Sequence, residues 1–148
     1  MSRRRARELA LRALYAHELS GNVVEVIIED MIRHCDEDEK VKDFACNLLK
    51  ISVQNKEHCD NLIIQKTQNW DFERIAVIDK LILRLAICEF LFFEDIPPKV
   101  SIDEAIEIGK QYSTERSGQF INGILDSILV DLKKQDLLKK TGRGLQQD

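Results

Sequence analysis

The chain has 148 residues, of which 44% are hydrophobic and 32% charged, and it carries a net charge of −4 with a pI near 5.5. This length is enough for one domain with its own core, and the composition excludes a disordered chain and a protein that coats DNA indiscriminately. No apolar run approaches the roughly 20 residues of a membrane-spanning helix. The arginine-rich start lacks the apolar stretch of a secretion signal, so we expect a cytoplasmic protein.

Positive charge is concentrated in the first twelve residues. They contain five arginines and one glutamate, a net charge of +4, which leaves −8 for residues 13–148. The arginines are Arg3, Arg4, Arg5, Arg7 and Arg12. Because guanidinium groups suit phosphate oxygens, this cluster is a candidate nucleic-acid contact, and the asymmetry predicts two different partners. A solvated, frayed terminus is the alternative.

The first predicted helix ends at residues 20–22 and has one apolar stripe, formed by Ala6, Leu9, Ala10, Ala13, Leu14 and Leu19. Arg12 and Tyr15 are surface neighbours on it, and Arg5 lies two turns before Arg12 on the same side. Single-stranded RNA recognition needs this combination, since arginine holds the backbone and tyrosine stacks on a base. The alternative for Tyr15 is a half-buried core tyrosine.

The next segments are also predicted to be helical. A second amphipathic segment covers about residues 23–34, and the acidic run at residues 36–39 supplies N-terminal charge for a third helix. Helical spacing continues over residues 41–68, with a polar stretch at residues 54–58. One bent helix or two helices are expected there.

A break at residues 69–71 precedes a segment, residues 75–93, that is apolar on nearly every side and therefore belongs at the centre of the fold. Its charged residues exclude a membrane span: Asp79, Lys80, Arg84 and Glu89. We interpret Arg84 and Glu89 as a structural pair or network.

The last third of the chain predicts two more helices. Pro97-Pro98 forces a linker, and Ser101 and Glu104 are arranged as a capping box for a helix over residues 102–112. A turn at residues 113–118 leads to the final helix, in which Gly123 permits close packing or the approach of a partner. No segment alternates like a strand, so the prediction is an all-α bundle of about seven helices.

Residues that carry out catalysis or bind metals occur without the spacing that such sites need. The four cysteines match neither zinc nor redox-pair spacing; Cys46 and Cys88 are expected in the core, and Cys35 and Cys59 partly exposed. No histidine spacing suits a metal, and no glycine-flanked serine or cysteine indicates an activated nucleophile. We therefore predict no enzyme, no cofactor and no metal site.

Four groups of residues occur in a distinctive order. The first comprises Arg3-Arg4-Arg5-Ala6-Arg7-Glu8 and Ala13-Leu14-Tyr15, and the second comprises Trp70, Arg74, Ile75, Asp79, Lys80, Leu83-Arg84-Leu85-Ala86 and Glu89. The third contains Pro97, Val100, Ile102-Asp103-Glu104-Ala105 and Lys110, and the fourth is Phe120-Ile121-Asn122-Gly123-Ile124-Leu125-Asp126. Over residues 3–132, this pattern resembles the NusB family of transcription antitermination factors.

The resemblance implies one RNA-binding helical domain over residues 1–132, with two three-helix halves and a further helix, followed by a basic, loose tail at residues 133–148. NusB proteins pair with NusE, a small ribosomal subunit protein, and the pair holds the single-stranded boxA element of nascent RNA. With RNA polymerase and other Nus factors, this assembly suppresses premature termination, mainly in ribosomal RNA synthesis.

Two sets of contact residues follow from the resemblance and, for Arg12, from its place beside Tyr15. RNA contacts are expected from Arg3, Arg4, Arg5, Arg7, Arg12, Tyr15, Tyr112 and Phe120. Glu73 and Asp79 match acidic positions that face NusE, where charge would steer a basic ribosomal protein. Arg116 departs from the pattern, because family members can carry an acid there.

Two other interpretations stay open. Some ribosomal RNA cytosine methyltransferases have an N-terminal domain similar to NusB, so the chain could be a fragment of such an enzyme. A helical adaptor or homodimer that does not bind RNA is the second alternative, since NusB relatives can self-associate and cover the arginines.

Overall fold

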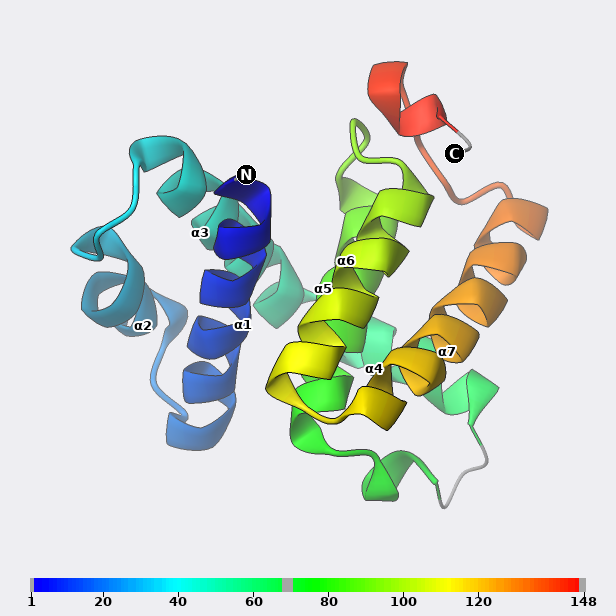
Figure 1. The fold of residues 1–148 in the computed structure, drawn as a ribbon, viewed down its shortest axis with the longest axis horizontal. Helices are drawn as coiled ribbons and strands as arrows, with labels where there is room; N and C mark the ends of the chain where they lie inside the picture. The colour runs from blue at the N-terminus through cyan, green and yellow to red at the C-terminus, as the bar shows by residue number, and fades with distance from the viewer. Residues whose placement is uncertain (1, 68–70, 147–148) are drawn as a thin grey trace. The chain divides into compact units, whose positions relative to one another are not determined.

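The computed structural model describes residues 2–67 and 71–146, and in these it contains seven α-helices, short 3-10 and π-helical turns, and no strand (Figure 1). The predicted all-α class is confirmed. The chain divides into two compact units, Met1–Asn55 (unit 1) and Lys56–Asp148 (unit 2). Within the described residues, no helix combines the length and the hydropathy that spanning a bilayer requires.

Unit 1 contains three helices: α1 (Ser2–Ser20), α2 (Val24–Ile28), which continues into a π-helical turn (Glu29–Arg33), and α3 (Glu39–Gln54). The principal contact is between α1 and α3. The acidic run does begin the third helix, as predicted, since the Asp38 carboxylate accepts a hydrogen bond from the Val41 N–H at 2.9 Å. This cap satisfies one of the amides that have no partner inside the helix.

The buried face of α1 is wider than the predicted stripe. Ala6, Ala10 and Leu14 are buried as expected, but Arg7 and Leu11, one turn apart, are buried as well. Leu19 was predicted on the buried stripe and is 64% exposed, because it lies at the end of the helix. The prediction was therefore wrong at Leu19 and incomplete at Arg7.

Unit 2 contains α4 (Lys56–Lys66), a 3-10 turn (Phe72–Arg74), α5 (Val77–Phe92), α6 (Pro98–Tyr112) and α7 (Glu115–Lys134). The long segment expected as one bent helix or two is two helices, α3 and α4, interrupted at Asn55. Asn69 and Trp70, at the predicted break after α4, lie outside the described residues.

The centre of unit 2 is α5, which packs against α4, α6 and α7. Every residue from 81 to 90 is buried, as its all-round apolar character predicted. The two charged residues in this stretch have internal contacts: Glu89 accepts a hydrogen bond from Ser101 Oγ at 2.7 Å, and Arg84 Nη2 lies 3.8 Å from Asp60 Oδ1. Both charges therefore belong to the core, where a removed partner is costly.

The capping box predicted at Ser101 and Glu104 is wrong. The helix begins earlier, at Pro98, because proline at the first helical position lacks only an N–H that would have no partner inside the helix. Ser101 lies inside α6, where its hydroxyl is used by Glu89. The capping box occurs instead at the start of α7, between Thr114 and Ser117.

Small residues bring α6 and α7 together at positions other than Gly123. A Cβ on Gly109 would come within 2.6 Å of Ile121 Cδ1, and one on Gly118 would meet Lys110 and Ile106 at 3.2 to 3.3 Å. Gly123 is exposed, and a Cβ there would meet no described atom within 4 Å. Close packing within the chain therefore does not explain Gly123.

The cysteines differ in part from expectation. Cys88 is buried as predicted, but Cys59, expected to be partly exposed, is also buried, and the two Sγ atoms are 3.6 Å apart. Cys46, expected in the core, is half-buried. In the described residues no group of histidine, cysteine and carboxylate side chains has the arrangement of a metal site.

The segment after α7 is docked rather than loose. The Lys140 ammonium donates to the backbone carbonyls of Glu89 and Phe93 at 2.9 and 2.7 Å, at the end of α5. The Thr141 N–H donates to the Glu94 carbonyl at 3.0 Å, and a Cβ on Gly144 would collide with that carbonyl. The structure therefore differs from the predicted loose tail over residues 136–146.

Candidate nucleic-acid interface

The first arginines of α1 lie against an aromatic ring of α3. The guanidinium carbons of Arg3 and Arg7 are 4.6 and 5.5 Å from the centroid of the Phe44 ring. These residues are four apart and share one face of α1, which makes simultaneous cation–π contact possible. Arg3 is exposed, whereas Arg7 is only 5% exposed.

The burial of Arg7 corrects the expectation that its side chain contacts RNA. Its position lies on the same helical row as Leu11, so the guanidinium enters unit 1 and stacks on Phe44 instead of facing solvent. A buried guanidinium that is held in this way supports the helix pair. Arg7 is therefore not available to a phosphate in this structure.

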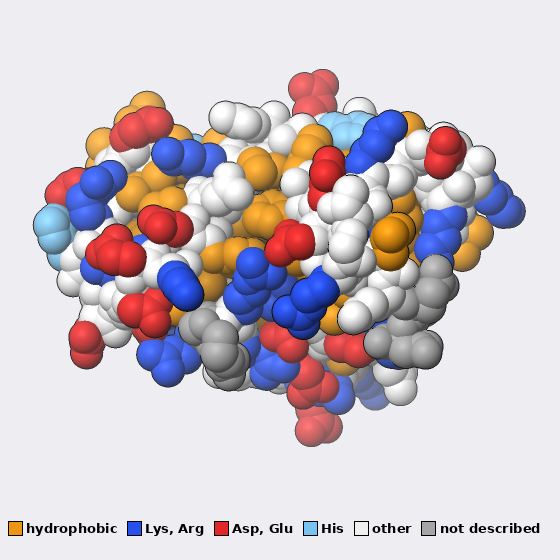
Figure 2. All heavy atoms as spheres, turned by 90° about the horizontal axis from the view of Figure 1, so that it is seen from above, with side chains coloured by type: hydrophobic (Ala, Val, Ile, Leu, Met, Phe, Trp, Pro, Cys, Tyr) orange, Lys and Arg blue, Asp and Glu red, His pale blue; other side chains and the backbone are white. Residues whose placement is uncertain are grey.

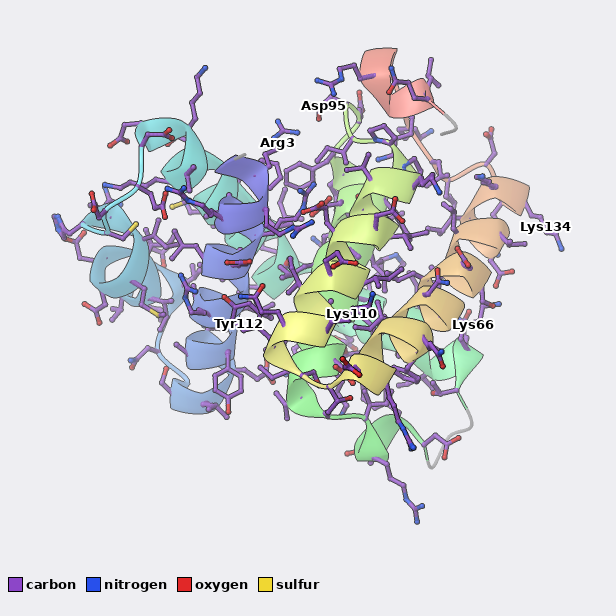
Figure 3. All side chains as sticks on the ribbon, in the orientation of Figure 1. Arg3, Lys66, Asp95, Lys110, Tyr112 and Lys134 are labelled. Carbon is purple, nitrogen blue, oxygen red and sulfur yellow. The ribbon has the colours of Figure 1, made fainter. Side chains whose placement is uncertain are left out.

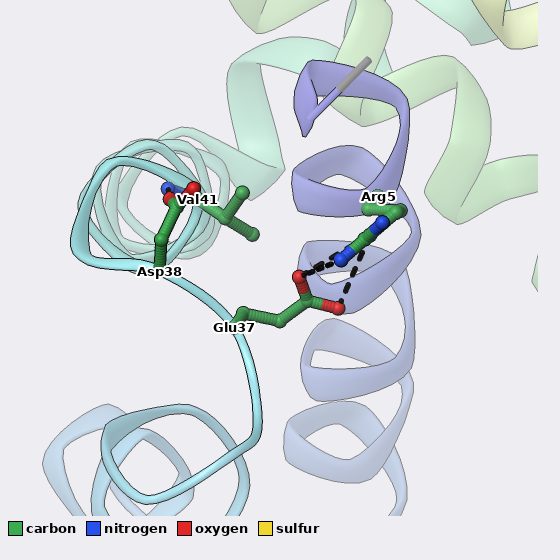
Figure 4. A network of polar contacts seen from close by, with 4 residues as sticks. All are labelled: Arg5, Glu37, Asp38 and Val41. Atoms are coloured by element: carbon green, nitrogen blue, oxygen red, sulfur yellow. Dashed lines mark hydrogen bonds and ion pairs between the residues drawn. The ribbon is translucent and has the colours of Figure 1, made fainter.

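Arg5 forms an ion pair with Glu37, in the loop before α3 (Figure 4). Nη2 donates to Oε1 at 2.6 Å, and Nε lies 3.2 and 3.3 Å from the two carboxylate oxygens. The hydrogen bonds to Glu37, and then its charge, raise the pKa of the Arg5 guanidinium above its ordinary value. Arg5 is thus exposed but already bound to an anion of its own chain.

The exposed side of α1 continues through Arg12 and Tyr15. Arg12 is exposed, and Tyr15 is 37% exposed, so its ring is partly accessible beside a guanidinium. The ring is thus partly accessible and partly buried, so its exposure fits both the stacking role and the half-buried core tyrosine. Arg4 is half-buried. On the face shown in Figure 2, basic and acidic side chains are interspersed, so positive charge is local rather than continuous.

The other two aromatic candidates belong to unit 2. Tyr112, labelled in Figure 3, is the last residue of α6 and is half-buried. Phe120 is half-buried in α7 and lines a pocket of about 520 Å³ together with Asp79. The structure thus brings Phe120, expected to contact RNA, together with a residue expected to contact the protein partner.

Asp79 is the most constrained residue of this pocket. It is 8% exposed, and its Oδ2 accepts a hydrogen bond from Ser117 Oγ at 3.0 Å. Its Oδ1 is buried, and among the described residues it has no hydrogen-bond partner. The pocket is also lined by Lys66, Thr67, Asp71, Arg74, Ile75, Ala76 and Ile124. A buried acceptor without a donor is costly, so this oxygen is suited to a donor from outside the chain.

Glu73, the other acidic candidate, and Arg116, which differs from the family pattern, are both at the surface. Glu73 is exposed in the 3-10 turn before α5, two residues from the pocket-lining Asp71. Arg116 is exposed in the first turn of α7. Both residues are accessible to a partner.

Two residues that organise α1 were missed in the sequence. Phe44 was visible only as an apolar position of a helix, and Glu37 only as part of an acidic helix start. Glu37 is 32 residues from Arg5, and no periodicity connects a loop carboxylate to a distant arginine. For Arg7 a signal was present: Leu11 follows it by one turn on a row that continues to Leu14.

Comparison with known proteins identifies the family. Residues 4–130 match the NusB family. A Salinibacter ruber protein named transcription antitermination protein NusB is 48% identical over 145 residues, which cover 97% of this chain and 91% of that protein.

Solved structures agree with this result. A T. maritima NusB structure superposes with a TM-score of 0.80 at 40% identity, over 91% of this chain and 97% of that chain. A structure of the antitermination factors NusB and NusE in complex with dsRNA superposes with a TM-score of 0.79 at 23% identity, over 88% and 97%, and shows the shared fold alone. The chain therefore belongs to the NusB family, in which the Salinibacter ruber relative is named a transcription antitermination protein.

Proposed function

We propose that this protein binds boxA-type single-stranded RNA through the exposed side chains of α1 and a NusE-type ribosomal protein through the pocket around Asp79. It acts in the cytoplasm on nascent transcripts, as part of an RNA polymerase antitermination complex. There it suppresses premature termination, mainly in ribosomal RNA transcription.

The observation that carries the RNA half is the exposed pair Arg12 and Tyr15 on α1. A guanidinium beside an accessible aromatic ring supplies a phosphate contact and a stacking surface three residues apart. Arg3 extends this surface toward the start of the helix, where Phe44 limits the freedom of its side chain. A NusB of this fold forms a complex with NusE and dsRNA, which is why RNA is the partner proposed here.

The protein half is supported by the Asp79 pocket. Its buried Oδ1 offers one acceptor, and Phe120 and Ile124 offer apolar surface beside it. A lysine, an arginine or a backbone N–H from a basic ribosomal protein would satisfy this oxygen. An unsatisfied buried acceptor costs about 1–3 kcal/mol, which a bound donor recovers.

The RNA half is tested by titrating a labelled boxA-type single-stranded RNA at several salt concentrations, with and without NusE from the same organism. Three phosphate contacts, from Arg3, Arg4 and Arg12, give a log–log salt slope of about −2. Arg12→Ala weakens binding several-fold and makes the slope less negative by about 0.7. Arg33→Ala, which removes another exposed arginine of unit 1, is the matched control. Equal binding by the native protein and Arg12→Ala would remove α1 from the interface.

The protein half is tested by Asp79→Asn and pull-down or calorimetry with NusE. Replacing the acceptor charge weakens the pair about tenfold if Oδ1 takes a charged donor. Glu107→Gln, an exposed carboxylate on α6, is the control. Thermal unfolding of both variants separates lost binding from lost folding. Unchanged affinity in a folded Asp79→Asn protein would place NusE elsewhere.

A homodimer formed through unit 1 is the alternative to RNA binding. Leu19 and Val23 are exposed apolar side chains next to the end of α1, and a second copy would cover them. Sedimentation velocity over a range of protein concentrations decides between the assemblies. A dimer that dissociates as RNA is added would show that self-association and RNA use the same surface.

A further inference from the structure

One contact on α1 is not explained by RNA binding or by core packing. The Arg5–Glu37 pair joins an exposed helix residue to a loop carboxylate through the same edge of the guanidinium that binds phosphate oxygens in pairs (Figure 4). Carboxylate and phosphate present two oxygens at similar spacing to this edge. Glu37 therefore occupies the position that an RNA phosphate would take on Arg5.

The carboxylate is the less exposed partner, and it lies in a loop whose backbone is held on both sides. The Glu37 side chain is 23% exposed and that of Arg5 63% exposed. The Glu37 N–H donates to the Cys35 carbonyl at 3.0 Å, and the next residue, Asp38, caps α3. Arg5 extends from an exposed helical face on a flexible stem. The Arg5 side chain is therefore the more accessible partner for a phosphate.

Neighbouring charges strengthen the hold of the loop on Arg5. The charges of Asp38 and Asp36, like that of Glu37, raise the pKa of the Arg5 guanidinium. A phosphate that approaches Arg5 meets these carboxylates as well as the arginine. Yet the pair is exposed, and exposed ion pairs are weak enough to exchange with a ligand. The loop therefore lowers the contribution of Arg5 without preventing it.

We infer that Glu37 sets the affinity of α1 for RNA by competing, as an internal carboxylate, with backbone phosphate for the Arg5 guanidinium. This inference rests on the proposed binding of RNA by α1. Glu37 then changes the affinity for the phosphate backbone and makes no contact with a base. Arg5 then contributes less to binding than it would without Glu37, although it is an exposed arginine of α1.

A double-mutant cycle tests this competition with a boxA-type single-stranded RNA. Glu37→Gln keeps the size of the side chain and removes its charge, and it binds the RNA roughly three- to tenfold more tightly than the native protein. Its salt slope becomes more negative by about 0.7, the value of one additional phosphate contact. Arg5→Ala changes binding less than about twofold in the native background. In the Glu37→Gln background, Arg5→Ala removes the whole gain.

Glu39→Gln is the matched control, because it removes an equal charge two residues away whose ion-pair partner is Lys42, at 3.9 Å. It leaves affinity within about twofold of native. An equal gain from Glu39→Gln would replace the competition with a general charge effect and overturn the inference. Weaker binding by Glu37→Gln would also overturn it, by making Glu37 a residue that positions Arg5 for RNA.

The outcomes separate this inference from the proposed function. If the native protein binds RNA, Arg12→Ala weakens it and Glu37→Gln does not change it, only the role of Glu37 is refuted. If neither the native protein nor Glu37→Gln binds the RNA, both the proposed function and the competition are refuted.

Discussion

Units 1 and 2 place their charged residues differently. The arginines of α1 other than Arg7 lie at least partly in solvent, and Arg5 meets a loop carboxylate there. In α5, Arg84 and Glu89 are buried and have contacts inside unit 2. An exposed charge exchanges its partner at little cost, whereas a buried charge that loses its partner destabilises the fold. The location of an arginine, more than its presence in a basic cluster, therefore decides whether it can bind a ligand.

The largest expected effect comes from breaking a buried contact. Arg84→Ala lowers the free energy of unfolding by about 3–5 kcal/mol, because Asp60 and the surrounding core lose a charged partner. Arg33→Ala breaks an exposed pair with Glu29 and costs about 0.5 kcal/mol or less. Urea unfolding followed by circular dichroism measures both. Similar costs would contradict the distinction between the two units.

The second prediction applies the same distinction within α1. Arg7→Ala lowers the free energy of unfolding by about 2 kcal/mol, since it removes a buried guanidinium stacked on Phe44 and its packed stem. Arg12→Ala changes stability by less than about 0.5 kcal/mol. Urea unfolding measures both stabilities. The salt slope of RNA binding changes more in Arg12→Ala than in Arg7→Ala. A larger slope change for Arg7→Ala would return Arg7 to the interface.

A half-buried charge should give an intermediate effect. Lys140→Ala costs about 1–2 kcal/mol, because its ammonium donates to two carbonyls at the end of α5. Lys139→Ala, at an exposed neighbouring position, is the control. Hydrogen exchange at the Thr141 amide becomes faster in Lys140→Ala, as the docked segment is released. Unchanged exchange would mean that other contacts hold the segment.

The smallest expected changes in stability come from replacing one glycine in each unit. Gly123→Ala stabilises unit 2 by about 0.5–1 kcal/mol, since the position is exposed, helical and open. Gly21→Ala destabilises unit 1 by about 1 kcal/mol, because Gly21 has a φ of +73° after the end of α1. Thermal unfolding gives the sign of each change. A destabilised Gly123→Ala would reveal a packing role that the structure does not contain.

Periodicity predicted the elements of this fold well. The segment that is apolar on nearly every side forms α5, and the first twenty residues, with apolar positions three and four apart, form α1. The start of α6 was mistaken because Ser101 and Glu104 have the spacing of a cap but lie inside the helix. A pattern of two residues cannot distinguish a cap from a hydroxyl that serves a buried carboxylate on another helix.

The candidate site was less predictable, because its chemistry depends on contacts between distant residues. Arg12 and Tyr15 were found because helical spacing alone makes them neighbours. Glu37 was not found, since only the fold brings this loop residue to Arg5. Arg7 is buried because the buried face of α1 is wider than one apolar stripe, and Leu11, one turn later, indicates that width.

The docking of Lys140 also bears on synthesis by the ribosome. The carbonyls of Glu89 and Phe93 receive their donor from a residue 51 and 47 positions later, whereas the principal helix contact of unit 1 is made within its own 55 residues. Chains are released from the exit tunnel N-terminus first, and folding follows that order. All of unit 1 is thus synthesised before Lys140, so the basic helix can fold before the end of α5 receives the lysine ammonium.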